Sequence, residues 1–240
     1  MKLTGKIVLV TGGTDGIGAQ LIRQLRSKGA HVLTSGRNPL RIAATRADGF
    51  EVIEADISSQ AGIDSLITQL NGRVVDILIN NAGLMDEYDL ERGSPEPQQI
   101  EQVLFVNMHA PIQLITALLP VFQERQEAAI VNVTSGNAVA PRAKSPVYSA
   151  TKAGIRSFTQ ALRFQLAGSN IQVIEALPPG VETAMNKNSK RKTMSAKECA
   201  RQIVVGIERN QDEINVGQVK LLQFANSISP ALARWIMLRY

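Results

Sequence analysis

The stretch KIVLVTGGTDGIGAQLIRQLRSK, residues 6–28, decides the fold. Its first five residues are almost wholly apolar and rich in β-branched side chains, as in a buried strand, and residues 19–28 have the pattern of a helix. The turn between them has glycines at 12, 16 and 18, which allow a tight turn and a close approach of the backbone to a bound group. Their spacing differs from the G-x-G-x-x-G fingerprint. This segment alone is compatible with a pyrophosphate site at the helix N-terminus or with a plain strand-to-helix connection.

The rest of the chain repeats the same unit. Apolar runs at 30–35, 50–55, 74–80, 129–135 and 171–177 predict further strands, with helical stretches between them. This alternation predicts an α/β fold, a doubly wound parallel sheet in a three-layer sandwich. A chain of 240 residues with 44% hydrophobic content can form one core, and no Pro/Gly/Ser-rich linker divides it, so we expect a single domain over 1–240. Ligands of such sheets bind beyond the carboxyl ends of the strands.

Tyr148 and Lys152 stand four residues apart in YSATK, and Ser135 ends an apolar run thirteen positions before Tyr148. If 148–152 is helical, the phenol and the ammonium lie one turn apart on one face. A cation beside a tyrosine lowers its pKa and makes it a usable general acid or base. The hydroxyl of Ser135 could bond the same reacting oxygen. On its own, this spacing is also common on solvated helix faces.

Four motifs together resemble the short-chain dehydrogenase/reductase family. They are TGGTDGIG at 11–18, NNAG at 80–83, Ser135 with Tyr148 and Lys152, and PPGVET at 178–183. The resemblance extends from about Thr4 to Thr183 and continues more loosely to the end of the chain. It implies a Rossmann-like NAD(P)-binding domain and an oxidoreductase that transfers a hydride between a nicotinamide cofactor and a carbonyl or secondary alcohol.

The resemblance also implies a role for each catalytic residue. Tyr148 would exchange a proton with the substrate oxygen, and Lys152 would lower the pKa of Tyr148 and hold the nicotinamide ribose. Ser135 would orient and polarise the substrate oxygen. Asn107, at the family's fourth catalytic position, would hold a water that links Lys152 to solvent.

Cofactor contacts follow from the same motifs. The expected residues are Gly12, Thr14, Asp15, Gly16, Ile17, Gly18, Arg37, Asp56, Ile57, Asn81, Ala82, Gly83, Tyr148, Lys152, Pro178, Gly180, Val181 and Thr183. Asp56 would contact the adenine, although a helix N-cap or a loop acid is an alternative. The segment 80–83 would lie beneath the cofactor and also steady the sheet. Val181 and Thr183 would lie near the nicotinamide amide and the pyrophosphate.

The end of the second predicted strand indicates the cofactor. Gly36 stands where NAD-preferring relatives carry Asp, and Arg37 follows it, so a 2′-phosphate would be paired rather than repelled. We therefore predict NADP(H), with NAD(H) as the alternative. Asp15 argues weakly for NAD(H), and Arg37 could also be a solvated loop residue.

Charge and composition limit the partners. The net charge is +5, and Lys187, Lys190, Arg191 and Lys192 fall within 183–200, which by the resemblance is a lid over the substrate. A basic lid would favour an anionic substrate, but we prefer a solvated loop as the explanation. No aromatic platform accompanies these charges, so nucleic-acid binding is not expected. His31 and His109 have no carboxylate or cysteine at ligand spacing, so no metal is expected.

The sequence also gives expectations for the cellular compartment and for the role of the C-terminal tail. A single cysteine, Cys199, rules out an intrachain disulfide, and no secretory signal is recognisable, so cytoplasm is the default. The tail 221–240 is apolar, but Pro230 and Arg234 interrupt it, and a spanning helix needs about 20 apolar residues. We rank packing on a neighbouring subunit first, closure of the substrate pocket second and association with a membrane surface third.

Substrate identity is beyond the sequence. The pocket would be formed by 137–146 and 183–193, and Ala138, Val139, Ala140 and Val147 suggest an apolar approach to the carbonyl. The resemblance implies a homodimer or homotetramer built through the helices that contain Asn107 and Tyr148. The rival hypothesis is a catalytically silent dinucleotide-binding regulator. Such proteins usually lack the tyrosine or the lysine, and this chain has both.

Overall fold

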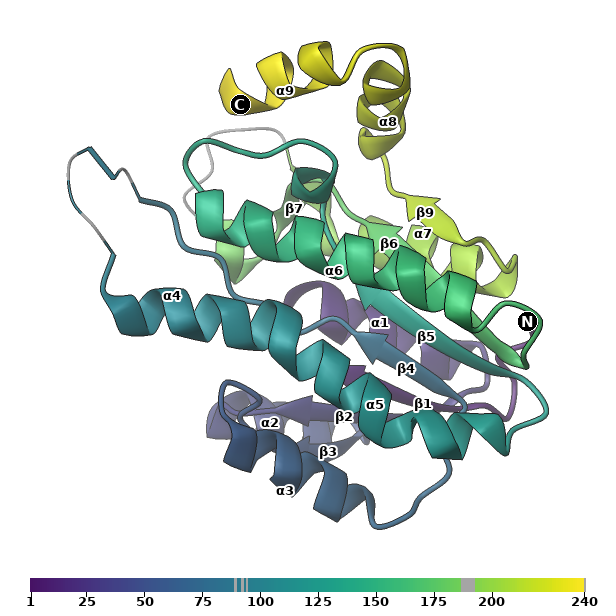
Figure 1. The fold of residues 1–240 in the computed structure, drawn as a ribbon. Coiled ribbons are helices and arrows are strands. Elements are labelled where there is room, and N and C mark those ends of the chain that lie inside the picture. The colour runs from purple at the N-terminus through teal and green to yellow at the C-terminus, as the bar shows by residue number, and fades with distance from the viewer. Residues whose placement is uncertain (89, 92, 94, 187–192, 240) are drawn as a thin grey trace.

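Seven parallel strands form the central sheet of the computed structural model, in the order β3-β2-β1-β4-β5-β6-β9 (Figure 1). They are β1 (Ile7–Thr11), β2 (His31–Gly36), β3 (Glu51–Glu54), β4 (Ile77–Asn80), β5 (Ala128–Val133), β6 (Ile171–Leu177) and β9 (Glu213–Asn215). The structure describes residues 1–88, 90, 91, 93, 95–186 and 193–239, so the basic cluster at 187–192 and Tyr240 lie outside the described residues. The doubly wound parallel sheet predicted from the sequence is confirmed.

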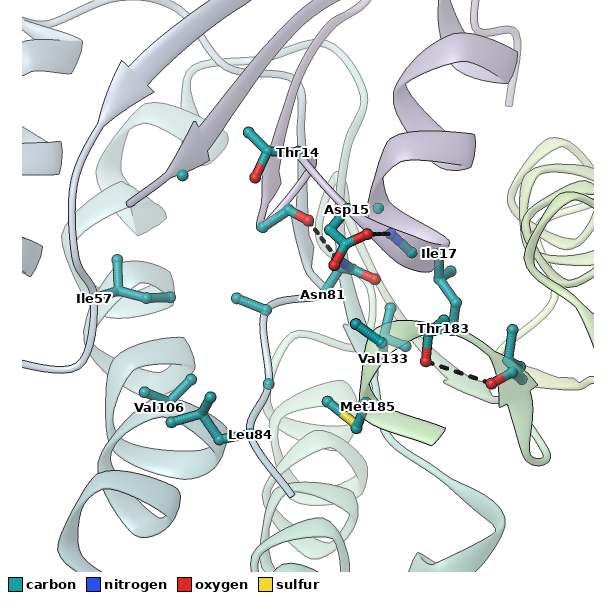
Figure 2. Close-up of a pocket in the computed structure, with 18 of the residues that line it drawn as sticks. Thr14, Asp15, Ile17, Ile57, Asn81, Leu84, Val106, Val133, Thr183 and Met185 are labelled. Carbon is teal, nitrogen blue, oxygen red and sulfur yellow. Dashed lines mark hydrogen bonds between the residues drawn. The ribbon is translucent and has the colours of Figure 1, made fainter. Parts of the chain in front are cut away.

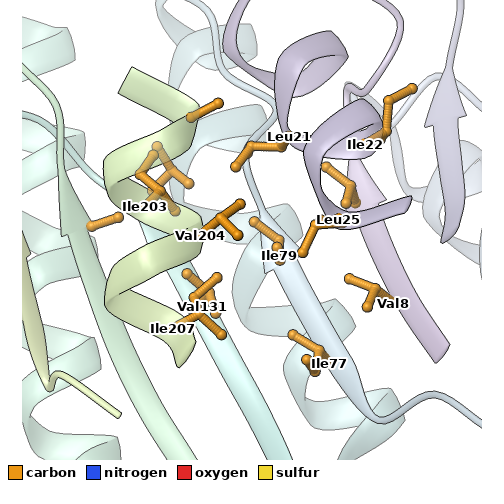
Figure 3. Close-up of a cluster of buried hydrophobic side chains, with 14 of the residues drawn as sticks. Val8, Leu21, Ile22, Leu25, Ile77, Ile79, Val131, Ile203, Val204 and Ile207 are labelled. Atoms are coloured by element: carbon orange, nitrogen blue, oxygen red, sulfur yellow. The ribbon is translucent and has the colours of Figure 1, made fainter. Parts of the chain in front are cut away.

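Helices cover both faces of this sheet. They are α1 (Gly16–Ser27), α2 (Pro39–Ala47), α3 (Gln60–Leu70), α4 (Pro97–Leu104), α5 (Ala110–Gln123), α6 (Pro146–Gln165), α7 (Ala196–Glu208), α8 (Val219–Ile228) and α9 (Pro230–Arg239). On one face, α1 and α7 pack over β1, β4 and β5 through side chains such as Leu21, Ile203 and Ile79 (Figure 3). On the other face, α3, α5 and α6 form a second apolar cluster around Leu66, Leu114 and Leu162.

Short elements connect or flank these layers. A π-helical turn, η1 (Phe105–His109), joins α4 to α5, and the 3-10 turns η2 (Gly136–Ala138) and η3 (Ala184–Asn186) follow β5 and β7. The strands β7 (Val181–Glu182) and β8 (Met194–Ser195) pair in parallel, and β8 lies inside the segment 183–200 that was predicted as a lid. Among the described residues, the continuous helix 97–123 is long and apolar enough to cross a membrane. Its inner face is buried in the second cluster at Ala110, Leu114 and Phe122, so it serves as a core helix here.

A row of polar residues crosses the sheet beneath α6. Asn80 of β4, Asn132 of β5, Glu175 of β6 and Glu213 of β9 are successive register partners. The side chain of Asn80 donates to Asn132 (2.9 Å), and that of Asn132 donates to Thr159 of α6 (2.9 Å). We call these four strand residues the polar row.

The tail forms two helices, α8 and α9, that stand apart from the sheet (Figure 1). Their apolar side chains are largely exposed: Leu221, Phe224, Ile228, Leu232, Trp235, Ile236 and Leu238. The buried residues Val219 and Ala233 attach the two helices to the body and to each other.

Candidate active site

A pocket of about 440 Å³ lies at the carboxyl ends of the strands, where the sequence predicted a ligand site (Figure 2). It runs from the glycine turn after β1, past the ends of β2 and β3, to the residues that follow β5 and β6. Most of the predicted site residues line it: Gly12, Thr14, Asp15, Gly16, Ile17, Gly18, Arg37, Asp56, Ile57, Asn81, Ala82, Gly83, Ser135, Tyr148, Lys152, Pro178, Val181 and Thr183. The structure does not place Asn107 or Gly180 among the lining residues.

The glycine turn is shaped by close backbone packing. A Cβ atom at Gly18 would lie 2.2 Å from the carbonyl oxygen of Gly12, and Gly12 itself has a φ of +67°. Asp15 caps α1 by accepting a hydrogen bond from the amide of Gly16 (2.8 Å). The turn therefore brings backbone close to the pocket and directs the N-terminus of α1 towards it, an arrangement that suits an anionic group.

The segment 80–83 fastens the end of β4 to this turn. The Asn81 side chain donates to the carbonyl oxygens of Thr11 (3.0 Å) and Gly12 (3.3 Å). In return, the Thr11 hydroxyl accepts from the amides of Asn81 (3.0 Å) and Ala82 (3.1 Å). These bonds agree with the partly structural role expected for this motif.

Helix α6 carries Tyr148 and Lys152, which are 9% and 5% exposed, on the pocket wall. The ammonium of Lys152 lies 5.6 Å from the centre of the Tyr148 ring and donates to the carbonyl oxygen of Val133 (2.9 Å). Ser135 lies two residues beyond the end of β5, and its hydroxyl accepts from the Asn137 amide (3.1 Å) and acts on the pKa of Tyr148. The fold thus brings together the three residues that the sequence singled out.

Burial dominates the pKa values of this pair. It raises the pKa of Tyr148, and the hydrogen bond with Ser135 offsets part of that rise. Burial also lowers the pKa of Lys152 to about 8, against the attraction of Glu175. The net lowering of the Tyr148 pKa expected from the sequence is not seen in this structure, because desolvation of the buried phenolate outweighs the interactions that favour it.

Asn107 lies in η1 and is buried. Its side chain accepts from the Leu84 amide (2.8 Å) and donates to the Leu84 carbonyl (2.7 Å) and to the Thr151 hydroxyl (3.1 Å). A Cβ atom at Gly83 would lie 3.2 Å from Asn107 Oδ1 and 3.7 Å from Lys152 Nζ. Asn107 therefore fixes the chain after β4 beside Lys152 from behind the pocket wall.

The opposite end of the pocket holds two arginine–aspartate ion pairs. Arg37 pairs with Asp56 (3.3 Å), and Arg41 pairs with Asp15 (2.7 Å). Burial works against ionisation of Asp56, but hydrogen bonds from Ser58 and the charge of Arg37 lower its pKa overall. The N-cap of α3 is Ser59, so Asp56 is a loop acid rather than the cap.

The sequence did not identify Arg41 as a pocket residue, and it did not explain why residue 36 is a glycine. Arg41 lies in the first turn of α2, four residues after Arg37, and its side chain reaches back to Asp15. A Cβ atom at Gly36 would lie 2.6 Å from the methyl group of Thr14, so Thr14 occupies the space that an acidic side chain would need. Arg37 lies before the start of α2, so the two arginines do not share a helical face and no local pattern marked Arg41.

The PPGVET segment closes the pocket over the glycine turn. The methyl group of Thr183 lies 2.9 Å from where a Cβ atom of Gly16 would stand. Apolar side chains that the sequence did not single out, Leu84, Val106 and Met185 among them, line the same end of the pocket (Figure 2). Within the described part of the chain, no cluster of three or more His, Cys, Asp or Glu residues is arranged to hold a metal ion.

Comparisons with known proteins agree with this geometry. Residues 6–194 match the short chain dehydrogenase family model. The uncharacterized oxidoreductase DltE of Bacillus subtilis is 33% identical over 235 residues, which cover 94% of this chain and 93% of that protein. A short-chain dehydrogenase from Sphingobium yanoikuyae, solved with NADPH, is 27% identical with a TM-score of 0.81 over 87% of each chain.

A second solved structure extends the comparison. The 3-ketoacyl-(acyl-carrier-protein) reductase from Brucella melitensis, complexed with NADH, is 26% identical with a TM-score of 0.81, over 90% of this chain and 99% of the other. The family model covers well over half of the chain, and it matches the segment that holds the glycine turn, Ser135, Tyr148 and Lys152. The chain therefore belongs to the short-chain dehydrogenase family of Rossmann-type oxidoreductases.

Proposed function

We propose that this protein is an NADP(H)-dependent oxidoreductase that interconverts a carbonyl and a secondary alcohol. The observation that carries the proposal is that Ser135, Tyr148 and Lys152 line the same pocket as the glycine turn. The glycine turn fits a dinucleotide, because Gly12, Gly16 and Gly18 line the pocket with backbone and the α1 N-terminus points to it. The bound nicotinamide would supply or take up the hydride.

The residues of this chain perform the proton chemistry. In the reducing direction, the Tyr148 hydroxyl gives its proton to the substrate oxygen as negative charge develops there. Ser135 donates a hydrogen bond to the same oxygen and holds it in place. The positive charge of Lys152 stabilises the tyrosinate left behind, and its ammonium is placed to hold the ribose hydroxyls.

Arg37 and Arg41 support the preference for NADP(H). Their side chains are 52% and 50% exposed and lie at the end of the pocket where β2 stops. Each is paired with an acid, and a dianionic 2′-phosphate would attract both guanidinium groups away from those acids. The relatives do not decide the choice, because one solved structure holds NADPH and another NADH.

We infer that the substrate reaches the pocket at its apolar end, beside Leu84, Val106 and Met185. We also propose a homodimer or homotetramer in the cytoplasm, with no nucleic-acid or membrane partner. The helices that contain Asn107 and Tyr148 would form the interface, and Leu104, Met108 and Phe164 on these helices are exposed. The α8–α9 tail is the second candidate for contact between subunits.

Replacing Tyr148 with Phe tests the mechanism. Turnover should fall by roughly 10²- to 10⁴-fold because the proton donor is lost. Affinity for NADPH should change by less than about twofold, since the ring remains in place. The substrate is sought by following NADPH absorbance with a panel of ketones, aldehydes, sugars and acyl-thioesters. Calorimetry measures the affinity for the cofactor.

Two results would contradict this proposal. A Tyr148→Phe variant that reduces the substrate at near the parental rate would exclude Tyr148 as the proton donor. A parent protein that binds NADPH but turns over no carbonyl in the panel would favour the rival function, a catalytically silent regulator that senses the cofactor.

A further inference from the structure

A buried acid stands behind the catalytic pair. Glu175 is in the middle of the polar row on β6, is 0% exposed and lies outside the pocket lining. Its Oε1 accepts from the Thr134 hydroxyl (2.7 Å), and its Oε2 accepts from the Arg156 guanidinium (2.6 Å). Burial of a carboxylate is costly unless it is paired and hydrogen-bonded, and both conditions are met here.

Arg156 connects this acid to the active site along α6. Tyr148, Lys152 and Arg156 follow one another at intervals of four residues, so they lie on one face of the helix. Arg156 bonds Glu175 with one nitrogen and Glu213 of β9 with the other (3.1 Å). Burial raises the pKa of Glu175, while the Thr134 hydrogen bond and the charge of Arg156 act against that rise. With both carboxylates ionised, the trio has a net charge of −1.

The charge of Arg156 alone would disfavour a second cation one turn away. Like charges in a partly desolvated environment lower the pKa of a lysine, and Lys152 is already depressed to about 8 by burial. The negative charge of Glu175 acts in the opposite direction on Lys152. The other groups around Lys152 are the Val133 carbonyl, the Tyr148 phenol and the neutral Asn107 near Gly83.

Thr134 links the same acid to the end of β5. Its hydroxyl is bonded to Glu175, and its neighbours in the chain are Val133, whose carbonyl accepts from Lys152, and Ser135. Thr134 also donates its amide to the Ala176 carbonyl of β6 (2.8 Å). The backbone that presents Ser135 is thus held to β6 at Glu175 and at Ala176.

We propose that Glu175 is a positioning residue for the catalytic pair, which keeps Lys152 protonated during turnover and fixes the end of β5 that presents Ser135. The inference rests on the proposed oxidoreductase function. In this inference the Glu175–Arg156–Glu213 trio influences the protonation of Lys152, which an ion pair with a purely structural role would not do.

The test compares two variants whose effects have opposite signs. Glu175→Gln keeps the size of the side chain but removes its charge, so the pKa of Lys152 should fall by about one pH unit. Arg156→Gln removes the competing cation, so at pH values where Glu175 stays ionised the pKa of Lys152 should rise. Titration of the lysine side-chain nitrogens by NMR, with Lys152→Arg for assignment, measures both shifts without any substrate.

The pH profile of turnover is the second readout. In Glu175→Gln the loss of activity on the alkaline side should move to lower pH, and in Arg156→Gln to higher pH. Glu54→Gln, which removes one negative charge near the far edge of the sheet, is the control and should leave both readouts unchanged. Circular dichroism checks that each variant is folded.

The outcomes separate this inference from the proposed function. If both variants lose activity or stability while the pKa of Lys152 and the pH profile stay at the parental values, Glu175 is structural only and the inference fails. If Glu175→Gln does not fold, an unchanged Lys152 pKa in Arg156→Gln overturns it. If the pKa shifts appear but no carbonyl is turned over, the electrostatic coupling stands and the proposed function fails.

Discussion

Replacing Arg37 with Ala should weaken NADPH binding about tenfold and leave NADH binding nearly unchanged. A hydrogen bond to a charged group is worth about 1.5–3 kcal/mol, and the 52% exposure of Arg37 places it at the lower end of that range. About 1.4 kcal/mol corresponds to a tenfold change in affinity. The substitution also frees Asp56, whose carboxylate would then repel the 2′-phosphate.

Arg41→Ala should behave in the same way, because its loss frees Asp15. The two arginines would share one phosphate, so the losses need not add, and the double variant should lose roughly 30- to 100-fold. Calorimetric titration with NADPH and with NADH, at low and high salt, measures the effect, which salt should reduce.

Arg23→Ala is a matched control. Its ion pair with Asp48 (2.9 Å) is as exposed as the other two, and it lies outside the pocket lining. Its replacement should leave both affinities at the parental values. Equal losses of NADPH and NADH binding in Arg37→Ala, or a parent that binds NADH more tightly, would refute the assignment of these arginines to a 2′-phosphate.

Two further predictions concern the backbone and the tail. Gly18→Ala puts a methyl group 2.2 Å from the Gly12 carbonyl, so it should weaken binding of both cofactors and cost about 1–3 kcal/mol in urea denaturation. Gly180→Ala, with no neighbour closer than 3.6 Å, should cost less than about 0.5 kcal/mol. Truncation after Ser229 removes α9 and should change the oligomeric state in light scattering. An unchanged oligomer would exclude α9 from the subunit interface, and lost lipid association would favour a membrane role.

The central strands were predictable because they are buried on both faces, as β4 and β5 are throughout. Near-continuous apolar runs mark such strands, and 171–177 coincides with β6 as observed. The strand β9 escaped notice because Glu-Ile-Asn is three residues long and has no apolar run. The strands β7 and β8 have two residues each, so contacts with neighbouring segments, and not their own sequence, determine their extended form.

The candidate catalytic residues could be located from the sequence because they fall within ordered motifs, whereas their electrostatics could not. The charge next to Lys152 depends on Glu175, which is hidden in a strand read as apolar, and on Arg156 nineteen residues earlier. Arg41 reaches the pocket only because α2 begins where β2 ends, which brings its side chain to Asp15. Contacts between distant segments of this kind leave no local pattern.

The polar row also determines how the strands align. In an apolar parallel sheet, sliding one strand by a single residue moves every side chain to the other face. A slip of β6 would turn Glu175 away from Arg156 and into the apolar layer of α1 and α7, leaving a buried charge without a partner. Misaligned sheets are therefore penalised far more strongly than in a core of valines and isoleucines alone. The polar row therefore allows one register of the strands, and that register also sets where the strand ends stand at the mouth of the pocket.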